Sequence, residues 1–363
     1  MFKDSSLHIA ARDSIAWWKA WLIRLIAVLL SLIVCAIVIF GLTKMNPVEV
    51  YKGIFSGAVG TSRRAWVTIR DTMVLLLIAI GLTPAFKMKF WNIGAEGQIL
   101  VGGAATAALM IYAGDSLPTP VLMILMFVAS MAAGVIWGVI PAIFKAYFNT
   151  NETLFTLMLN YVAMQLVTFA IVFWENPSGS NTVGIINAAG QKGWFPSIFG
   201  NMYGLNVIVV LIITLGMYVY MKYSKQGYEI AVVGESQNTA RYAGINVKKV
   251  IIRTMMLSGA ICGIAGCLIV SGASHTISTS TAGGRGFTAI IVAWMSKFNP
   301  FAMILVSAFL VFMQQGSIQI ASQFGLNENA SDIITGILLF FLIGCEFFIN
   351  YKLEWKKNHK EGK

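Results

Sequence analysis

Polar side chains interrupt an otherwise apolar part of the chain at Phe90–Gln98. Amide and charged groups are costly in lipid, so they face the interior of a bundle or a water-filled cavity. The glycines between them permit a tight turn or a broken helix. Asn92 and Gln98 are therefore candidates for lining a solute pathway. The alternative is a cytosolic turn with Glu96 in the first turn of the next helix, stabilised by the helix dipole.

Two further polar side chains, Asn160 and Gln165, lie inside a single apolar run. They are about 140° apart around a helix, so they do not share one face. Hydrogen bonding to another helix is one role for such groups, and contact with solute is the other. Both side chains are neutral, which favours a neutral polar solute such as a sugar or a nucleoside.

The sequence contains no pattern typical of an enzyme. It has three His and four Cys, without HExxH, GxSxG or CxxC spacing, and no phosphate-binding loop of the GxxxxGK[ST] type. We therefore expect no catalytic residue, no metal site and no cofactor on this chain.

A polar segment, Lys222–Lys249, separates two apolar runs and must lie in water. Its centre predicts a short helix that starts at Glu235 or Ser236 and has Arg241 in its last turn. Gly244 fits the first position after the helix (C′). The next residue, Ile245, fits the second position (C″), from which its side chain can contact Ala240.

The small residues Ala240 and Ala243 of this helix predict a thin surface that enters a groove of a cytosolic partner. The alternative is an ordinary amphipathic helix that lies on its own bundle. The candidate docking residues are Glu235, Ala240, Arg241, Tyr242 and Gly244.

The composition indicates a polytopic membrane protein. The chain is 57% hydrophobic and 11% charged, whereas soluble domains carry about 25% charged residues. Its net charge of +11 is explained by topology and anionic lipid rather than by nucleic acid. We predict an all-α bundle in the cell membrane with about ten spans, some of them short or broken. The predicted spans are 21–43, 66–86, 97–113, 119–144, 154–174, 204–221, 250–272, 284–296, 300–323 and 331–350.

The basic residues predict the orientation. With the N-terminus inside, most of the 26 Lys and Arg residues fall on the cytosolic side, which places both termini there. The basic stretch 44–70 is the exception, and an amphipathic surface helix would explain it. The predicted organisation is a cytosolic segment 1–20, a transmembrane domain 21–350 with the cytosolic loop 222–249, and a basic tail 351–363.

Several motifs occur in order along the chain: Asn92–Gln98, Asn151–Thr153, Thr156–Asn160, Ala240–Ile245 and Gly284–Ile290. Together they resemble the permease subunits of ABC importers for nucleosides and simple sugars, and most closely the nucleoside branch. Residues 90–110 and 284–300 are also alike, as expected for the pseudo-repeat of that family. Arg285 and the basic residues of 52–70 depart from the pattern and have no assigned role.

The resemblance implies partners. They are a cytosolic ABC ATPase that holds ATP and Mg, a second homologous permease subunit, an extracytoplasmic substrate-binding (lipo)protein and membrane lipid. It also implies that the segment 222–249 holds the helix that couples to the ATPase, and that transport proceeds by alternating access. The competing interpretation is an ion-coupled secondary transporter, which usually carries acids within its spans. The predicted spans are nearly free of acids, which favours the importer.

Overall fold

The computed structural model describes residues 7–12, 15–43, 46–198, 200–323 and 328–355. Most of these residues are helical, because a helix satisfies its own backbone hydrogen bonds in lipid. The chain divides into two compact units, one formed by Met1–Ala65 with Phe312–Lys363 and the other by Trp66–Val311.

The first unit brings the two ends of the chain together. The N-terminal strand β1 pairs antiparallel with β2, with Leu7 opposite Trp355 and Ala11 opposite Tyr351. An entirely α-helical chain was expected, so this small sheet is a difference; β2 alternates apolar and charged residues, as strands do. The elements of this unit are β1 (Leu7–Ala11), α1 (Trp17–Thr43), α2 (Pro47–Val59), α13 (Glu328–Asn350) and β2 (Tyr351–Trp355).

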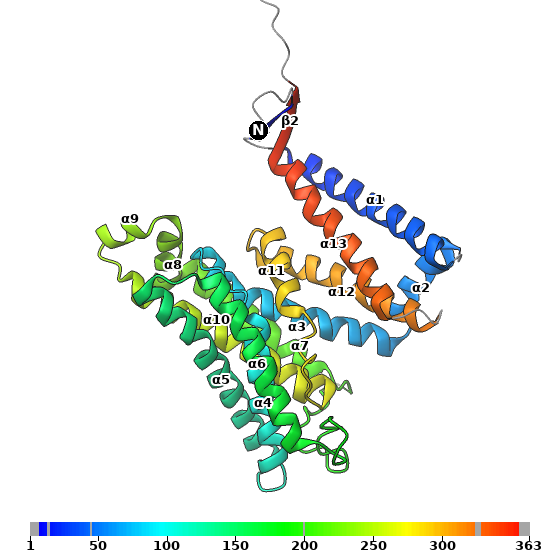
Figure 1. The fold of residues 1–363 in the computed structure, drawn as a ribbon, viewed down its shortest axis with the longest axis vertical. Coiled ribbons are helices and arrows are strands. Elements are labelled where there is room, and N and C mark those ends of the chain that lie inside the picture. The colour runs from blue at the N-terminus through cyan, green and yellow to red at the C-terminus, as the bar shows by residue number, and fades with distance from the viewer. Residues whose placement is uncertain (1–6, 13–14, 44–45, 199, 324–327, 356–363) are drawn as a thin grey trace, which may run out of the picture. The chain divides into compact units, whose positions relative to one another are not determined.

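The second unit is a helical bundle (Figure 1). Two helices belong to both units: α3 (Ser62–Lys87) has most of its length in this one, and α12 (Pro300–Gln323) is divided equally between the two. The other elements are α4 (Ala95–Ala113), α5 (Thr119–Phe148), α6 (Glu152–Trp174), α7 (Gly204–Tyr223), α8 (Lys225–Glu235), α9 (Gln237–Tyr242), α10 (Val247–Ile269), the π-helical turn η1 (Val270–Ser274) and α11 (Arg285–Met295).

Every predicted span coincides with a helix, to within a few residues. Among the described residues, seven helices are long and apolar enough to cross a membrane: α1, α3, α5, α6, α7, α10 with η1, and α12. The count of ten spans and the cytosolic position of the termini therefore stay predictions. A helix, α2, does form within the basic stretch 44–70, but its place at a membrane surface is untested.

The centre of the second unit is α10, which packs against α4 and α5 (Figure 1). Glycines allow this approach: a Cβ at Gly134 of α5 would overlap the carbonyl oxygen of Gly259 of α10, and one at Gly259 would overlap that of Gly134. Gly263 lies equally close to the backbone of Ser130. Small residues four apart thus bring these two helices into backbone contact.

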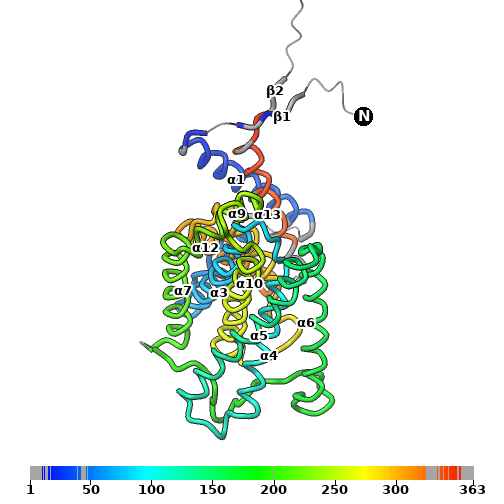
Figure 2. Tube along the Cα trace, turned by 90° about the vertical axis from the view of Figure 1, so that its left-hand side faces the viewer, coloured from blue at the N-terminus to red at the C-terminus, as the bar shows by residue number. Residues whose placement is uncertain are grey.

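Two helices, α4 and α11, start inside the bundle rather than at its ends. Figure 2 shows α9 at one end of the second unit, hereafter the α9 end, and the α6–α7 loop at the opposite end. The carbonyl of His275, just after η1, accepts a hydrogen bond from Ile186 of that loop. The chain then returns into the bundle, because the amide of Gly284 bonds to Glu96 in α4. The predicted short span 284–296 therefore corresponds to the short helix α11, and an irregular segment precedes it.

The close approach of α5 and α10 leads to a stability prediction. In detergent, Gly134→Ala lowers the free energy of unfolding by about 1–3 kcal/mol, because the added methyl group forces the two backbones apart. The matched control is Gly216→Ala on α7, where nothing lies within 4 Å of the added Cβ. Thermal unfolding should show a lower midpoint for the first variant and an unchanged or higher one for the control. Equal midpoints would contradict the packing argument.

Candidate functional site

The carboxylate of Glu96 joins the starts of the two interior helices. It accepts hydrogen bonds from the backbone amides of Gly284 at 2.6 Å and Gly286 at 2.8 Å, and the residue is buried. These amides form the N-terminus of α11, whose dipole favours a negative charge. Glu96 does lie in the first turn of α4, as expected, but its carboxylate caps a second helix instead of facing water.

Asn160 on α6 fixes the turn before α4. Its side-chain oxygen accepts a hydrogen bond from the amide of Gly97 at 2.8 Å, and its side-chain nitrogen donates to the carbonyl of Ile93 at 2.9 Å. The hydroxyl of Thr156, one turn earlier, accepts from the amide of Ile93 at 3.2 Å. An asparagine pairs in this way with a backbone donor and a backbone acceptor at once. The turn is therefore bound to α6 through its own backbone.

Asn92 connects the same turn to α10. Its side-chain oxygen caps the amide of Gly94 at 3.0 Å, and its nitrogen donates to the hydroxyl of Ser258 at 3.2 Å and, at 3.5 Å, to Gln98. Asn92, Gln98 and Asn160 are all buried. The structure therefore brings three of the four predicted pathway residues together and gives them hydrogen-bond partners within the bundle. The fourth, Gln165, lies exposed elsewhere on α6.

Contact with solute stays a prediction for these four residues. For the three buried ones, the structure contains the alternative role, hydrogen bonding between helices and turns. Sequence reasoning missed Ser258, whose hydroxyl is one of many in apolar runs and has no distinguishing spacing. It also missed Asp71, a buried acid inside α3, which was visible as a charge within an apolar run.

The segment 222–249 folds as two short helices, α8 and α9, rather than one. Ser224 caps the first and Ser236 the second, each through its hydroxyl oxygen and an amide three residues later. Gly244 has φ +75°, and its amide donates to Arg241 at 3.0 Å, while the amide of Ile245 donates to Ala240 at 2.9 Å. This pair of bonds is a Schellman motif. Of the two predicted starts, Ser236 is confirmed and Glu235 is instead the last residue of α8; the predicted stop at Gly244 is confirmed.

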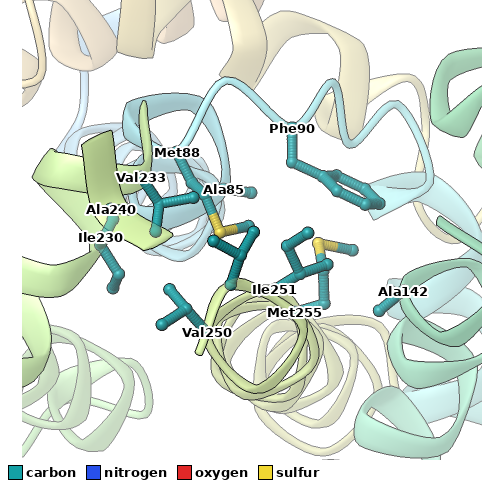
Figure 3. Close-up of a cluster of buried hydrophobic side chains, with 11 residues drawn as sticks. Ala85, Met88, Phe90, Ala142, Ile230, Val233, Ala240, Val250, Ile251 and Met255 are labelled. Carbon is teal, nitrogen blue, oxygen red and sulfur yellow. The ribbon is translucent and has the colours of Figure 1, made fainter. Parts of the chain in front are cut away.

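The burial of one residue of α9, Ala240, differs from the prediction. Ala240 is fully buried and belongs to an apolar cluster with Ile230 and Val233 of α8 and Val250 of α10 (Figure 3). The expectation that Ala240 contributes to an exposed surface is therefore wrong, because the only side of α9 that can bury a side chain is the one facing α8 and α10. Glu235, Arg241, Tyr242 and Gly244 are exposed, and Tyr242 is 94% exposed.

The cluster around Ala240, hereafter the α9 cluster, connects α9 to the bundle. It includes Ala85 near the end of α3, Met88 and Phe90 just after that helix, and Ala142 of α5 (Figure 3). A salt bridge of 2.9 Å joins Arg253 of α10 to Glu229 of α8. The α9 cluster therefore contains residues of α3, α5, α8 and α10 as well as α9.

The sequence is similar to those of known permease proteins. A family model described as "Branched-chain amino acid transport system / permease component" matches residues 66–343. The chain is 28% identical to the guanosine ABC transporter permease protein NupP of Bacillus subtilis, covering 88% of this chain and 92% of that protein. It is 26% identical to the glucose ABC transporter permease protein TsgB13 of Haloferax volcanii (96% and 93%) and to the nucleoside ABC transporter permease protein NupB of Lactococcus lactis (92% and 93%).

The Glu96 contact predicts a stability loss on neutralisation. Glu96→Gln leaves one of the two α11 amides facing an NH₂ group, so the variant loses about 1–3 kcal/mol of stability. Glu235→Gln, an exposed residue on α8, is the control and should unfold at the wild-type temperature. Thermal unfolding in detergent measures both. An unchanged midpoint for Glu96→Gln would show that the carboxylate does not stabilise α11.

Proposed function

The chain belongs to the branched-chain amino acid transport system / permease component family, and from this premise we propose that it forms the pathway of an ATP-driven importer for nucleosides or related sugars. It is a membrane-embedded permease subunit of an ABC importer. The proposal adds the solute, the orientation and the partners.

The observation that carries the proposal is the exposed face of α9. Arg241 and Tyr242 extend from a helix with a defined beginning and end, at one end of the bundle. Aromatic and arginine side chains are enriched where proteins bind tightly. The α9 cluster joins this helix to α3 and α10. A partner that binds α9 and moves it therefore also moves the bundle. We propose a cytosolic ABC ATPase as the partner that binds this helix. The α9 end of the bundle is then cytosolic.

In the proposed cycle, ATP binding closes the two ATPase halves, which hold ATP and Mg. The closing halves carry α9 with them, and the bundle changes the side on which its pathway is open. A second homologous permease subunit completes the pathway, and an extracytoplasmic substrate-binding protein delivers the solute at the opposite end.

The solute class follows from the relatives and from the chemistry of this chain. Guanosine, glucose and nucleosides, which the relatives' names give, are neutral molecules with adjacent hydroxyl groups. We extend this class to the present chain. The decisive experiment is co-purification of a cytosolic ATPase together with vanadate-sensitive uptake of labelled nucleosides and sugars in proteoliposomes.

An ion-coupled secondary transporter is the second candidate, and Asp71 favours it, because the predicted spans were expected to be nearly free of acids. Its carboxylate, however, lies 2.8 Å from the guanidinium of Arg70. A carboxylate already neutralised by a fixed cation is poorly suited to bind a coupling ion. Uptake that stops when ion gradients are abolished, and that vanadate does not affect, would support this candidate and contradict the importer.

The docking role of α9 predicts a loss of partner affinity. Tyr242→Ala weakens binding of the ATPase roughly tenfold, or about 1.4 kcal/mol, because it removes a large exposed aromatic contact. Tyr161→Ala on α6 is the control, since that side chain is 58% exposed and lies outside the α8–α9 region. Titration of the purified permease with the ATPase measures both affinities. Equal affinities for the two variants would exclude Tyr242 from the interface.

The end of α9 predicts a separate effect on coupling. Gly244→Val places a β-branched side chain at φ +75°, costs about 1–3 kcal/mol locally and displaces the helix end. ATP hydrolysis should then continue while uptake falls about fivefold or more. Gly179→Val is the control, because Gly179 has φ +81° and open space in the α6–α7 loop. Wild-type uptake and ATPase assembly in Gly244→Val would contradict the docking role of α9.

A further inference from the structure

A cavity of about 250 Å³ lies among α3, η1, the segment that follows η1, and the start of α11. Its lining is mostly polar, with five hydroxyl side chains and three charged ones. The hydroxyl residues are Ser274, Thr276, Ser278, Ser280 and Thr281, and the charged residues are Arg70, Asp71 and Arg285. Val74, Ile269 and Ala273 complete the lining.

The cavity adjoins the interior of α3, a helix long and apolar enough to cross a membrane. Asp71 is nine residues from the start of α3 and sixteen from its end, about 14 Å and 24 Å along the helix axis. The irregular segment after η1 lines the cavity from the other side. Non-helical backbone at membrane depth is tolerated only where it is buried in protein or lines a water-filled cavity. Ionisable residues at such a place mark a functional site by default.

The two arginines of the cavity differ in how closely their guanidinium groups are paired. Arg70 donates from Nε to Asp71 Oδ1 at 2.9 Å, and its guanidinium also lies 4.9 Å from the ring centre of Tyr203. Arg285, in contrast, makes two long contacts, 3.8 Å from Nη2 to Asp71 Oδ1 and 3.4 Å from Nη1 to the carbonyl of Thr281. Asp71 is thus neutralised by Arg70, and the guanidinium of Arg285 retains donors directed at the cavity side of this group.

We infer that this cavity binds the adjacent hydroxyl groups of the transported solute, with Arg285 donating, Asp71 accepting, and the serine and threonine hydroxyls donating or accepting. A carboxylate has capacity for about four hydrogen bonds, and each hydroxyl can donate one and accept two. The cavity offers no aromatic face for a base to stack on, and it is smaller than the roughly 300–1,000 Å³ of whole-ligand pockets. It therefore suits a sugar moiety rather than an entire nucleoside.

This inference rests on the proposed function, and it assigns a role to Arg285, one of the residues that the family resemblance left unexplained. It also relates the site to the Glu96 contact. Arg285 is the first residue of α11, and its neighbours Gly284 and Gly286 are the ones that Glu96 binds. The start of α11 is therefore held in place on one side by Glu96 while its first side chain reaches the cavity.

The test measures selectivity in the complete transporter, with its ATPase, second permease and binding protein, in proteoliposomes. The two solutes are a ribonucleoside and its 2′,3′-dideoxy analogue, which lacks the adjacent hydroxyls. Wild type should prefer the ribonucleoside. Arg285→Gln should raise KM for the ribonucleoside about tenfold, as expected for loss of a charge-assisted hydrogen bond, and leave KM for the analogue nearly unchanged.

Two further variants keep the test decisive. Ser280→Ala removes one lining hydroxyl at an exposed position and should raise KM for the ribonucleoside roughly threefold, again without affecting the analogue. Arg63→Gln, an exposed arginine nearer the start of α3, is the charge-matched control and should keep the wild-type ratio. If Arg285→Gln fails to assemble, the ratio of KM values in Ser280→Ala decides.

The site is disproved if wild type takes up both solutes equally, or if Arg285→Gln and Ser280→Ala keep the wild-type preference. These outcomes differ from failure of the proposed function. In that case wild type takes up neither nucleosides nor sugars in a vanadate-sensitive way, and the site is rejected with it.

Discussion

The contact between Glu96 and the start of α11 is the constraint on which the second unit depends. A buried carboxylate costs several kcal/mol unless it is hydrogen-bonded, and a helix that starts inside a bundle leaves amides that need acceptors. Each group satisfies the other's requirement. The interior start of α11, the irregular segment before it and the cavity that this segment lines all follow from that pairing.

The glycine contacts between α5 and α10 provide the frame around this centre. Because Gly134, Gly259 and Gly263 lack side chains, α10 lies in backbone contact with α5, and Asn92 of the α3–α4 turn reaches Ser258 on α10. At the α9 end, the α9 cluster joins the exposed helix to the same α10 and to the end of α3. The α9 cluster and the cavity at Arg285 therefore both include residues of α3 and α10, which is the connection that the proposed function requires.

The sequence was informative wherever a local pattern carries the structure. The apolar runs located the helices, and the small residues at Gly244 and Ser236 located the end and start of α9, because such features depend on residues a few positions apart. The sequence was less informative about which face of a helix is buried. Ala240 was expected to be exposed, yet it is buried, since which side of a six-residue helix is covered depends on α8 and α10 packing against it.

The sequence by itself determined that this is a helical membrane protein of the permease type, with a short, well-ended helix in a polar segment. Only the tertiary structure decided what its polar residues do. Glu96 and Gly284 are 188 residues apart, and Asp71 and Arg285 are separated still further. No periodicity within one helix encodes such pairs, because they form only when several helices pack and the remaining buried charges and amides must find partners.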